Sequence, residues 1–209
     1  MDYLILSALW IGWCVVHSLP VAPTVTAYFR RRLGERFRFY RVIYNMLAVL
    51  TLLPVLAYTF SLQGDTLFEW EGYLAVVPYA LIFVSGLLFL SGMRHYDMAQ
   101  FLGLRQLKER KDCKAITEDC SLDTSGILGA TRHPWYLGGI LIVWARDLDI
   151  SALITNAIIT GYFIIGTFLE ERKLVRQFGA DYRNYQQRVS MLLPYKWLKT
   201  RMKSFLKGA

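Results

Sequence analysis

The chain has 209 residues, of which 55% are hydrophobic and 19% charged, and its formal net charge is +8. Its mean hydropathy of +0.31 is higher than that of an ordinary soluble domain, so a membrane protein is the leading class. A basic chain can bind nucleic acid, but this sequence contains no nucleic-acid recognition module. The positions of its Lys and Arg residues are instead explained by the expected membrane topology.

Four apolar runs are long enough to cross a membrane as helices, which takes about 17 to 25 residues for roughly 30 Å of hydrocarbon. None contains Asp, Glu, Lys or Arg, and they span residues 3–19, 42–62, 73–93 and 151–169. No Lys or Arg precedes the first run and no small-x-small cleavage site follows it. We therefore expect a retained helix there, not a cleaved signal peptide.

A shorter apolar piece, residues 136–145, covers only about half a bilayer at ~1.5 Å per residue. It is expected to form one arm of a helical hairpin, with Arg146, Asp147 and Asp149 at the bend. The expected fold is therefore an all-α, polytopic integral membrane protein with about five transmembrane helices, its N-terminus outside and a hairpin near its C-terminus.

The basic residues are distributed very unevenly across this topology. With the N-terminus outside, 23 of the 24 Lys and Arg residues fall on the inner face, and Arg146 is the exception. The opposite loop, residues 63–72, carries three acidic residues and no cation. This distribution follows the positive-inside rule, and it favours attraction to anionic lipid headgroups over nucleic-acid binding.

Two cytosolic segments have patterns of their own. Residues 20–40 place aromatic residues and a leucine at steps of three or four among arginines, which predicts an interfacial helix. The polar segment 94–131 is too long for a simple connector, and we expect it to be functional.

Beyond the last apolar run, an apolar stripe predicts one cytosolic amphipathic helix packed on the membrane and ended by Pro194. The stripe comprises Leu174, Phe178, Tyr182, Tyr185 and Val189.

The segment "TRHPWYLGG", residues 131–139, places charge directly before an apolar helix. Pro134 disfavours helical torsions at His133, so a helix is expected to begin at Pro134. By the topology above, Arg132 and His133 lie at the same membrane face as Glu170 and Glu171. Ionisable groups at such a depth are candidates for function. A purely structural ion pair between Arg132 and one glutamate is an equally open explanation.

"RHPWYLGG", followed by "EERKLVRQFGADYRNYQQRVSMLLP", resembles the R-H-P-x-Y-x-G and E-E-x-x-L-x-x-x-F-G-x-x-Y-x-x-Y pattern of the isoprenylcysteine carboxyl methyltransferase and phospholipid methyltransferase superfamily. The match covers roughly residues 126–194. The resemblance implies an integral-membrane methyltransferase that uses S-adenosylmethionine on the cytosolic side.

The resemblance also implies residue roles. The expected cofactor-binding residues are His133, Tyr136, Leu137, Gly138, Glu170 and Glu171. A zwitterionic cofactor needs N–H donors or a cation for its carboxylate and an anion for its ammonium group, and this face offers both. The expected catalytic residues are Arg132, Glu171 and Arg41, the two arginines being suited to lowering the pKa of a thiol acceptor.

Two shorter segments, "WCVVHSL" and "GERFRFYRVIYN", resemble a bacterial branch that includes methanethiol S-methyltransferases and proteins named for nitrite and nitric oxide reduction clusters. They give the expected substrate-binding residues His17, Tyr40, Tyr44 and Asn45. The branch implies a bacterial inner membrane.

The acceptor is less well defined than the cofactor. Superfamily members that methylate the carboxylate of an isoprenylated cysteine carry an Arg five residues before the second glutamate, where this chain has Gly166. A small or lipophilic thiol is therefore the first expectation for the acceptor. The alternatives are a lipid or isoprenylcysteine carboxyl group, and a non-catalytic accessory protein of a respiratory system. A reductase is disfavoured because the chain lacks the Arg-Asp pair and Cys-Tyr-Pro ending of the sterol reductases that resemble this region.

We expect one membrane-embedded methyltransferase domain over residues 1–209. Its parts are a three-helix portion (1–93), a cytosolic loop (94–131), a cofactor-binding region (132–194) and a basic tail (195–209). Cys14, Cys113 and Cys120 lack metal-binding or redox spacing, so unpaired thiols and no metal site are expected. Oligomeric state is left open by the sequence.

Overall fold

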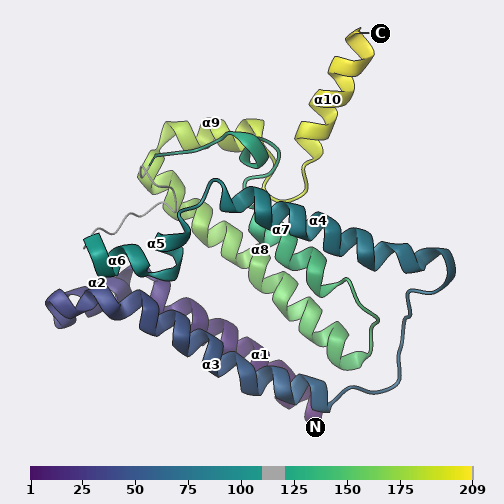
Figure 1. Ribbon diagram of the computed structural model, residues 1–209, viewed down its shortest axis with the longest axis horizontal. Helices are drawn as coiled ribbons and strands as arrows, with labels where there is room; N and C mark the ends of the chain where they lie inside the picture. Colours follow the sequence, from purple (N-terminus) through teal and green to yellow (C-terminus); the bar gives the residue numbers. More distant parts are fainter. Residues whose placement is uncertain (110–120, 209) are drawn as a thin grey trace. The chain divides into compact units, whose positions relative to one another are not determined.

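The computed structural model describes residues 1–109 and 121–208 of the chain (Figure 1). Within these residues the regular structure is helical, and the β-type pairing consists of isolated bridges. Four helical segments of the described chain are long and apolar enough to cross a membrane: Asp2–Val21, Pro23–Ser61, Gly72–Met93 and Ile150–Phe178. The expected all-α polytopic membrane fold is confirmed. Cys113 and Cys120 lie outside the described residues.

The described residues form two compact units. The first unit draws on Met1–Glu69, Met98–Asp112 and Asp147–Tyr162, and the second on Trp70–Asp97, Cys113–Arg146 and Phe163–Ala209. The long helix α8 (Ile150–Phe178) contributes its first part to one unit and its remainder to the other.

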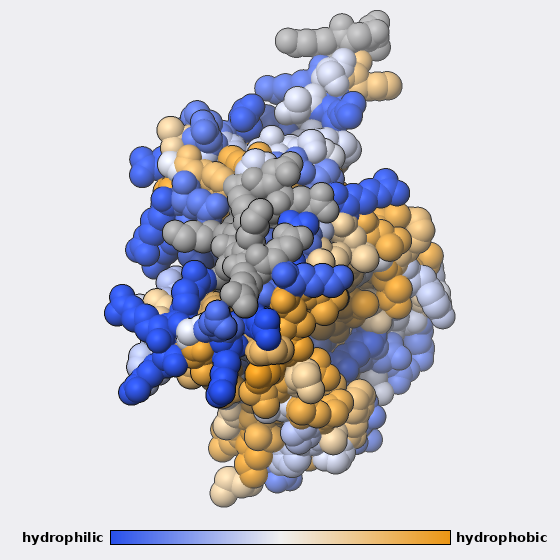
Figure 2. Space-filling model, turned by 60° about the vertical axis from the view of Figure 1, so that its left-hand side comes forward, coloured by the Kyte–Doolittle hydropathy of each residue, from blue (hydrophilic) through white to orange (hydrophobic). Residues whose placement is uncertain are grey.

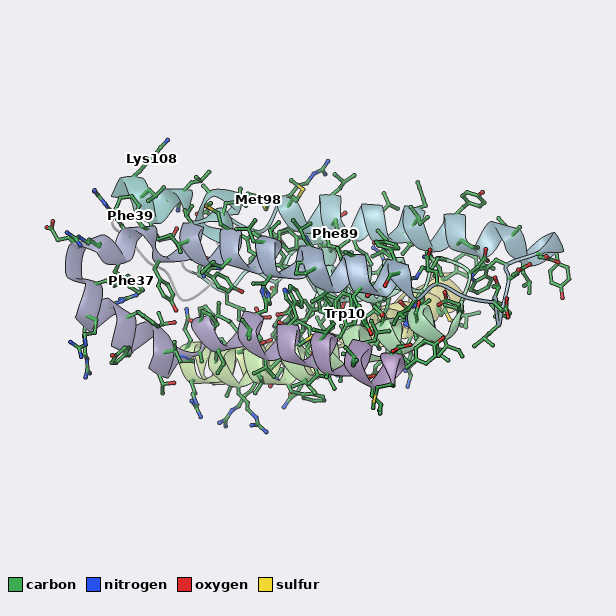
Figure 3. All side chains as sticks on the ribbon, turned by 90° about the horizontal axis from the view of Figure 1, so that it is seen from below. Trp10, Phe37, Phe39, Phe89, Met98 and Lys108 are labelled. Atoms are coloured by element: carbon green, nitrogen blue, oxygen red, sulfur yellow. The ribbon has the colours of Figure 1, made fainter. Side chains whose placement is uncertain are left out.

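The first unit is built on α1 (Asp2–Ser18) and α3 (Tyr40–Ser61), which lie side by side (Figure 1). Leu6, Trp10 and Val55 form the buried centre of their contact. Trp10, labelled in Figure 3, donates a hydrogen bond from its indole Nε1 to Thr59 Oγ1 over 3.0 Å. A buried indole thus keeps a polar partner where lipid would supply none.

The short elements of the first unit lie between and after these two helices. They are η1 (Leu19–Val21), α2 (Pro23–Leu33), η2 (Gly34–Phe39), α5 (Met98–Leu102) and α6 (Leu104–Glu109). The interfacial helix expected over residues 20–40 is therefore interrupted. It ends because Gly34 adopts φ +52°, a left-handed torsion that glycine tolerates best.

The second unit is centred on α4 (Val76–Met93) and α7 (Pro134–Val143), which pack closely along their lengths (Figure 1). Small residues allow this approach: Ser85 donates a hydrogen bond to the carbonyl of Gly138 over 2.9 Å. Trp135 lies against Gly92 and donates from Nε1 to the carbonyl of Phe89 over 3.1 Å. The expected short helix of about half a bilayer is confirmed as α7.

Gly92→Ala is expected to lower the free energy of unfolding by about 1 to 3 kcal/mol, as overpacking does. A Cβ at residue 92 would overlap the Trp135 indole, so the ring must move and its hydrogen bond to Phe89 must lengthen. Thermal unfolding in detergent, followed by tryptophan fluorescence, measures the effect. The matched control is Gly86→Ala on the same helix, where a Cβ meets no atom within 4 Å. Equal midpoints for the two variants would contradict this packing.

The described part of the second unit has four further elements, two before α7 and two after α8 in the chain. It contains η3 (Gly72–Ala75), η4 (Gly126–Gly129), α9 (Ala180–Arg188) and α10 (Tyr195–Gly208). Residues 144–149 separate α7 from α8, which confirms the expected bend. The C-terminal half of α8 runs antiparallel to α7, since Gly139 faces Phe163 while His133 faces Glu170.

One expectation for this region is wrong. The single amphipathic helix expected through residues 174–189 is divided at Gly179, whose φ of +58° ends α8 at Phe178 and lets α9 start in a new direction. Part of the apolar stripe of residues 174–189 is buried inside the protein and does not face lipid. Tyr182 and Tyr185 are buried and pack with Val189 in a second hydrophobic cluster that includes Leu122.

Much of the molecule's outer surface is apolar, as a bilayer requires. Figure 2 shows broad orange areas where hydrophobic side chains face outward. Examples from the spanning helices are Val49 at 59% exposed, Phe83 at 66% and Ile165 at 60%. Such exposure is unfavourable in water and favourable against lipid.

Candidate functional site

The start of the segment TRHPWYLGG (residues 131–139) is held in place by hydrogen bonds to Ser190 and Met191. The backbone N–H of Arg132 donates to the carbonyl of Ser190 over 3.0 Å, and that of His133 donates to Met191 over 3.2 Å. Thr131 adds a side-chain hydrogen bond to the Met191 carbonyl over 3.1 Å. Thr131 and Ser190 are each 1% exposed, so this clamp is part of the interior.

Helix α7 begins immediately after His133, as the proline predicts. His133 has φ −127° and ψ 66°, outside the helical region, and its carbonyl accepts the N–H of Leu137 over 3.1 Å. The His133 imidazole stacks on the Tyr136 ring with centroids 5.4 Å apart and planes 15° apart. The helix start therefore presents a buried histidine and an aromatic face together.

Glu171 is the centre of a dense polar cluster. Its Oε1 accepts from Arg132 Nε at 2.6 Å and lies 2.6 Å from Arg132 Nη2. His133 Nε2 is 3.3 Å from the same oxygen, and Tyr182 Oη donates to it over 3.5 Å. Gln186 Nε2 donates to Oε2 over 2.8 Å. Both carboxylate oxygens of Glu171 thus have protein donors.

Arg132 is equally engaged. Besides the two nitrogens directed at Glu171, its Nη1 donates to the carbonyl of Gln186 over 3.2 Å and also to the carbonyl of Val189. The side chains of Arg132 and Glu171 are only 7% and 11% exposed. The ion pair considered from the sequence therefore forms, and it fastens α7, α8 and the end of α9 to one another.

Glu170 has a different environment although it is the next residue. Its side chain is 31% exposed, and its Oε2 lies 3.7 Å from His133 Nδ1. The two glutamates thus contact opposite nitrogens of one imidazole, the first partly open and the second enclosed. The structure brings together the sequence-predicted residues Arg132, His133, Glu170 and Glu171, and it places Tyr136 beside them.

Three tyrosine hydroxyls line this part of the second unit. Burial raises the pKa of Tyr182, and the Glu171 carboxylate raises it further. Burial also raises the pKa of Tyr185, whose hydroxyl donates to the Leu128 carbonyl over 2.6 Å. The pKa of Tyr96 is raised by burial and then by Glu170. All three remain neutral at physiological pH, and Tyr182 and Tyr185 serve as hydrogen-bond donors.

Sequence reasoning missed a contact between two ionisable side chains, His95 and Asp123. His95 Nδ1 lies 2.6 Å from Asp123 Oδ2. Burial acts to raise the pKa of Asp123, but hydrogen bonds from the Ser125 backbone and hydroxyl and from His95 lower it below its ordinary value. The polar composition before the motif was the only signal for this pair, and it could not identify which residues meet.

The predicted substrate-binding residues belong to the first unit. Tyr44 Oη lies 3.0 Å from His17 Nδ1 and donates to the His17 carbonyl over 3.0 Å. Tyr40 donates to the Pro20 carbonyl over 3.0 Å. Asn45 donates to the carbonyls of Phe101 and Leu102, each over 3.2 Å.

Arg41, a predicted catalytic residue, also holds the chain at α5. Its Nε donates to the Phe101 carbonyl over 3.3 Å. The side-chain stem packs against Gly103, where an added Cβ would lie 3.0 Å from Arg41 Cβ. In this structure Arg41 and Asn45 fasten α3 to the short helices that follow α4 in the sequence.

These features define an all-α polytopic integral membrane protein with a buried Arg–Glu–His cluster at the start of a short membrane helix. The chain belongs to the NnrU protein family, whose model matches residues 5–190. The family matches the bacterial branch named from the sequence, and that expectation is confirmed.

Several curated relatives carry the name methanethiol S-methyltransferase. The chain is 34% identical over 119 residues to methanethiol S-methyltransferase 1 of Bradyrhizobium diazoefficiens, an alignment that covers 56% of this chain and 39% of the relative. It is 43% identical over 77 residues to the Pseudomonas deceptionensis protein, covering 36% and 29%. For the Crocosphaera subtropica protein the values are 27% over 137 residues, covering 63% and 52%.

The chain therefore spans about half or less of the length of these curated relatives. No solved structure matches the chain.

Proposed function

We propose that this chain is an integral-membrane, S-adenosylmethionine-dependent methyltransferase that methylates a small thiol. The observation that carries the proposal is the arrangement of Glu170, Glu171 and His133 at the start of α7, in a chain similar to proteins named methanethiol S-methyltransferase. Nearly all Lys and Arg residues fall on the predicted inner face, which supports a bacterial inner membrane with the site on the cytosolic side.

The residues present fit a zwitterionic cofactor. Its carboxylate suits the N-terminus of α7, where the helix carries positive partial charge, and its ammonium group suits a carboxylate. Because both oxygens of Glu171 already accept from protein donors, Glu170 is assigned to the ammonium group. His133 and Tyr136, together with the backbone of Leu137 and Gly138, are assigned to contact the same cofactor.

This assignment separates binding from positioning. Arg132 is a positioning residue, since its nitrogens are directed at Glu171 and at two backbone carbonyls. Glu171 in turn fixes the His133 imidazole through Nε2. The positions of His133 and Glu171 are thereby fixed by protein contacts before any ligand binds, which reduces the cost of alignment during the reaction.

When bound, S-adenosylmethionine supplies a methyl group on a sulfonium, which is transferred by in-line displacement. A thiol must react as the thiolate, and its ordinary pKa of about 8.5 leaves little thiolate at neutral pH. S-adenosylmethionine held by Glu170 and the start of α7 would supply the methyl group, and the acceptor thiol would give up its proton to a base or to water.

Position 166 supports a thiol over a carboxylate acceptor. A Cβ at Gly166 would lie 3.6 Å from the Tyr136 ring, so this position faces the proposed pocket wall. An arginine here, as in enzymes for isoprenylated cysteine carboxylates, could pair with an anionic acceptor, and glycine cannot. For His17, Tyr40, Tyr44 and Asn45, a role in acceptor binding stays a prediction.

Calorimetric titration with S-adenosylhomocysteine tests the proposal. The purified full chain in detergent or nanodiscs is expected to bind with measurable heat and an increase in thermal midpoint. The absence of both heat and thermal shift at millimolar ligand would contradict it, and would favour the alternative of a non-catalytic membrane accessory protein.

A further inference from the structure

An open, apolar groove of about 590 Å³ lies on the first unit, and all of its lining residues belong to that unit. Its walls come from the end of α1, from α2 and η2, and from the first three turns of α3. Phe29, Ile43 and Leu47 give it a hydrocarbon lining, and Thr51 lies at its far end along α3. A small thiol needs far less space than this groove provides, since drug-sized ligands occupy roughly 300 to 1,000 Å³.

The groove's length along α3 corresponds to one leaflet of a bilayer. It runs from Tyr40 to Thr51, which at ~1.5 Å per residue is about 16 Å. Half of the roughly 30 Å hydrocarbon core is about the same distance. The groove follows a membrane-spanning segment, Pro23–Ser61, over this length. Its dimensions therefore suit an extended acyl chain lying beside the helix.

The groove ends at η2, in a stretch (residues 30–38) that carries five arginines and one acidic residue, Glu35. Arg36 is one of its lining residues. Arg30 and Arg38 lie over the rings of Phe37 and Phe39 at 4.9 and 4.8 Å, and both phenylalanines are labelled in Figure 3. Guanidinium groups stacked on aromatic rings at a membrane interface keep their charge at headgroup level. The charge at this end is complementary to a phosphate.

We propose that this groove binds one acyl chain of an anionic phospholipid, with the lipid phosphate beside Arg36. Apolar lining of one-leaflet length accounts for the chain, and the arginine-rich end selects an anionic over a zwitterionic headgroup. The groove is also lined by His17, Tyr40 and Tyr44, for which acceptor binding is predicted above. The lipid proposal does not require methyl transfer, because lipid retention is measured without a methyl donor.

Native mass spectrometry of the full chain tests the proposal, using phosphatidylglycerol and phosphatidylcholine of equal chain length as probes. The unaltered protein is expected to retain phosphatidylglycerol several-fold more than phosphatidylcholine. Arg36→Gln is expected to remove most of this preference. Arg31→Gln, a change of the same charge on the same basic segment outside the groove lining, is expected to preserve it.

A second pair of variants tests the acyl-chain part of the groove. Thr51→Trp fills its far end and is expected to reduce retention of both lipids several-fold. Leu50→Trp is the matched control, because Leu50 is 56% exposed on the same helix and does not line the groove. Equal retention of the two lipids by the unaltered protein, or unchanged retention in Thr51→Trp, would overturn the proposal. Monodisperse elution of both tryptophan variants would show that folding is not the cause.

Discussion

Arg132→Met is expected to lower the free energy of unfolding by about 3 to 5 kcal/mol, the usual cost of leaving a buried charge without its partner. The change removes the two guanidinium nitrogens that contact Glu171 and the donors to the carbonyls of Gln186 and Val189. Thermal or denaturant unfolding of the detergent-solubilised protein, followed by tryptophan fluorescence, measures the loss.

Two controls make this result specific. Arg172→Met removes a neighbouring exposed cation and is expected to be nearly neutral. The double variant Arg132→Met with Glu171→Gln leaves no uncompensated charge, so it is expected to be more stable than Arg132→Met alone. If the double variant loses as much unfolding free energy as the two single variants added together, the two side chains do not act as a pair.

Glu170→Gln is expected to weaken binding of S-adenosylhomocysteine by roughly 10- to 100-fold, as loss of a hydrogen bond to a charged group does. The thermal midpoint without ligand should change little, because the Glu170 side chain is 31% exposed and its nearest charged contact is His133 at 3.7 Å. Calorimetry on the variant and the unaltered protein measures the ratio of affinities.

Asp181→Asn is the matched control for that experiment, since it neutralises an exposed carboxylate in the first turn of α9. It is expected to leave affinity unchanged. An unchanged affinity in Glu170→Gln together with a loss in Glu171→Gln at full stability would reverse the roles assigned to the two glutamates.

The membrane fold was predictable because lipid imposes simple rules on composition. The apolar runs beginning at Tyr3, Val42 and Tyr73 correspond to α1, α3 and α4 to within a few residues. The breaks were harder to predict. Gly34 and Gly179 end helices whose apolar pattern continues past them, and a periodicity argument gives no weight to a single left-handed glycine.

The meeting of Arg132, His133, Glu170 and Glu171 was likewise predictable, because helix lengths and topology place their backbones at one membrane face. The division of labour between the two glutamates was not. It depends on Gln186 and Tyr182, which approach Glu171 from α9. The direction in which α9 leaves the turn at Gly179 cannot be read from the periodicity of the sequence. The His95–Asp123 pair was missed for the same reason, since it joins two irregular segments.

Methyl transfer to a small thiol is measured most directly by incubating the purified full chain with labelled S-adenosylmethionine and a panel of acceptors. The panel contains small thiols including methanethiol, a prenylcysteine and phospholipids. Label is expected to pass to small thiols and hardly at all to the prenylcysteine carboxylate, and Glu170→Gln is expected to lose most of this transfer. If folded protein in a membrane transfers label to none of these acceptors, the proposed methyl transfer is contradicted.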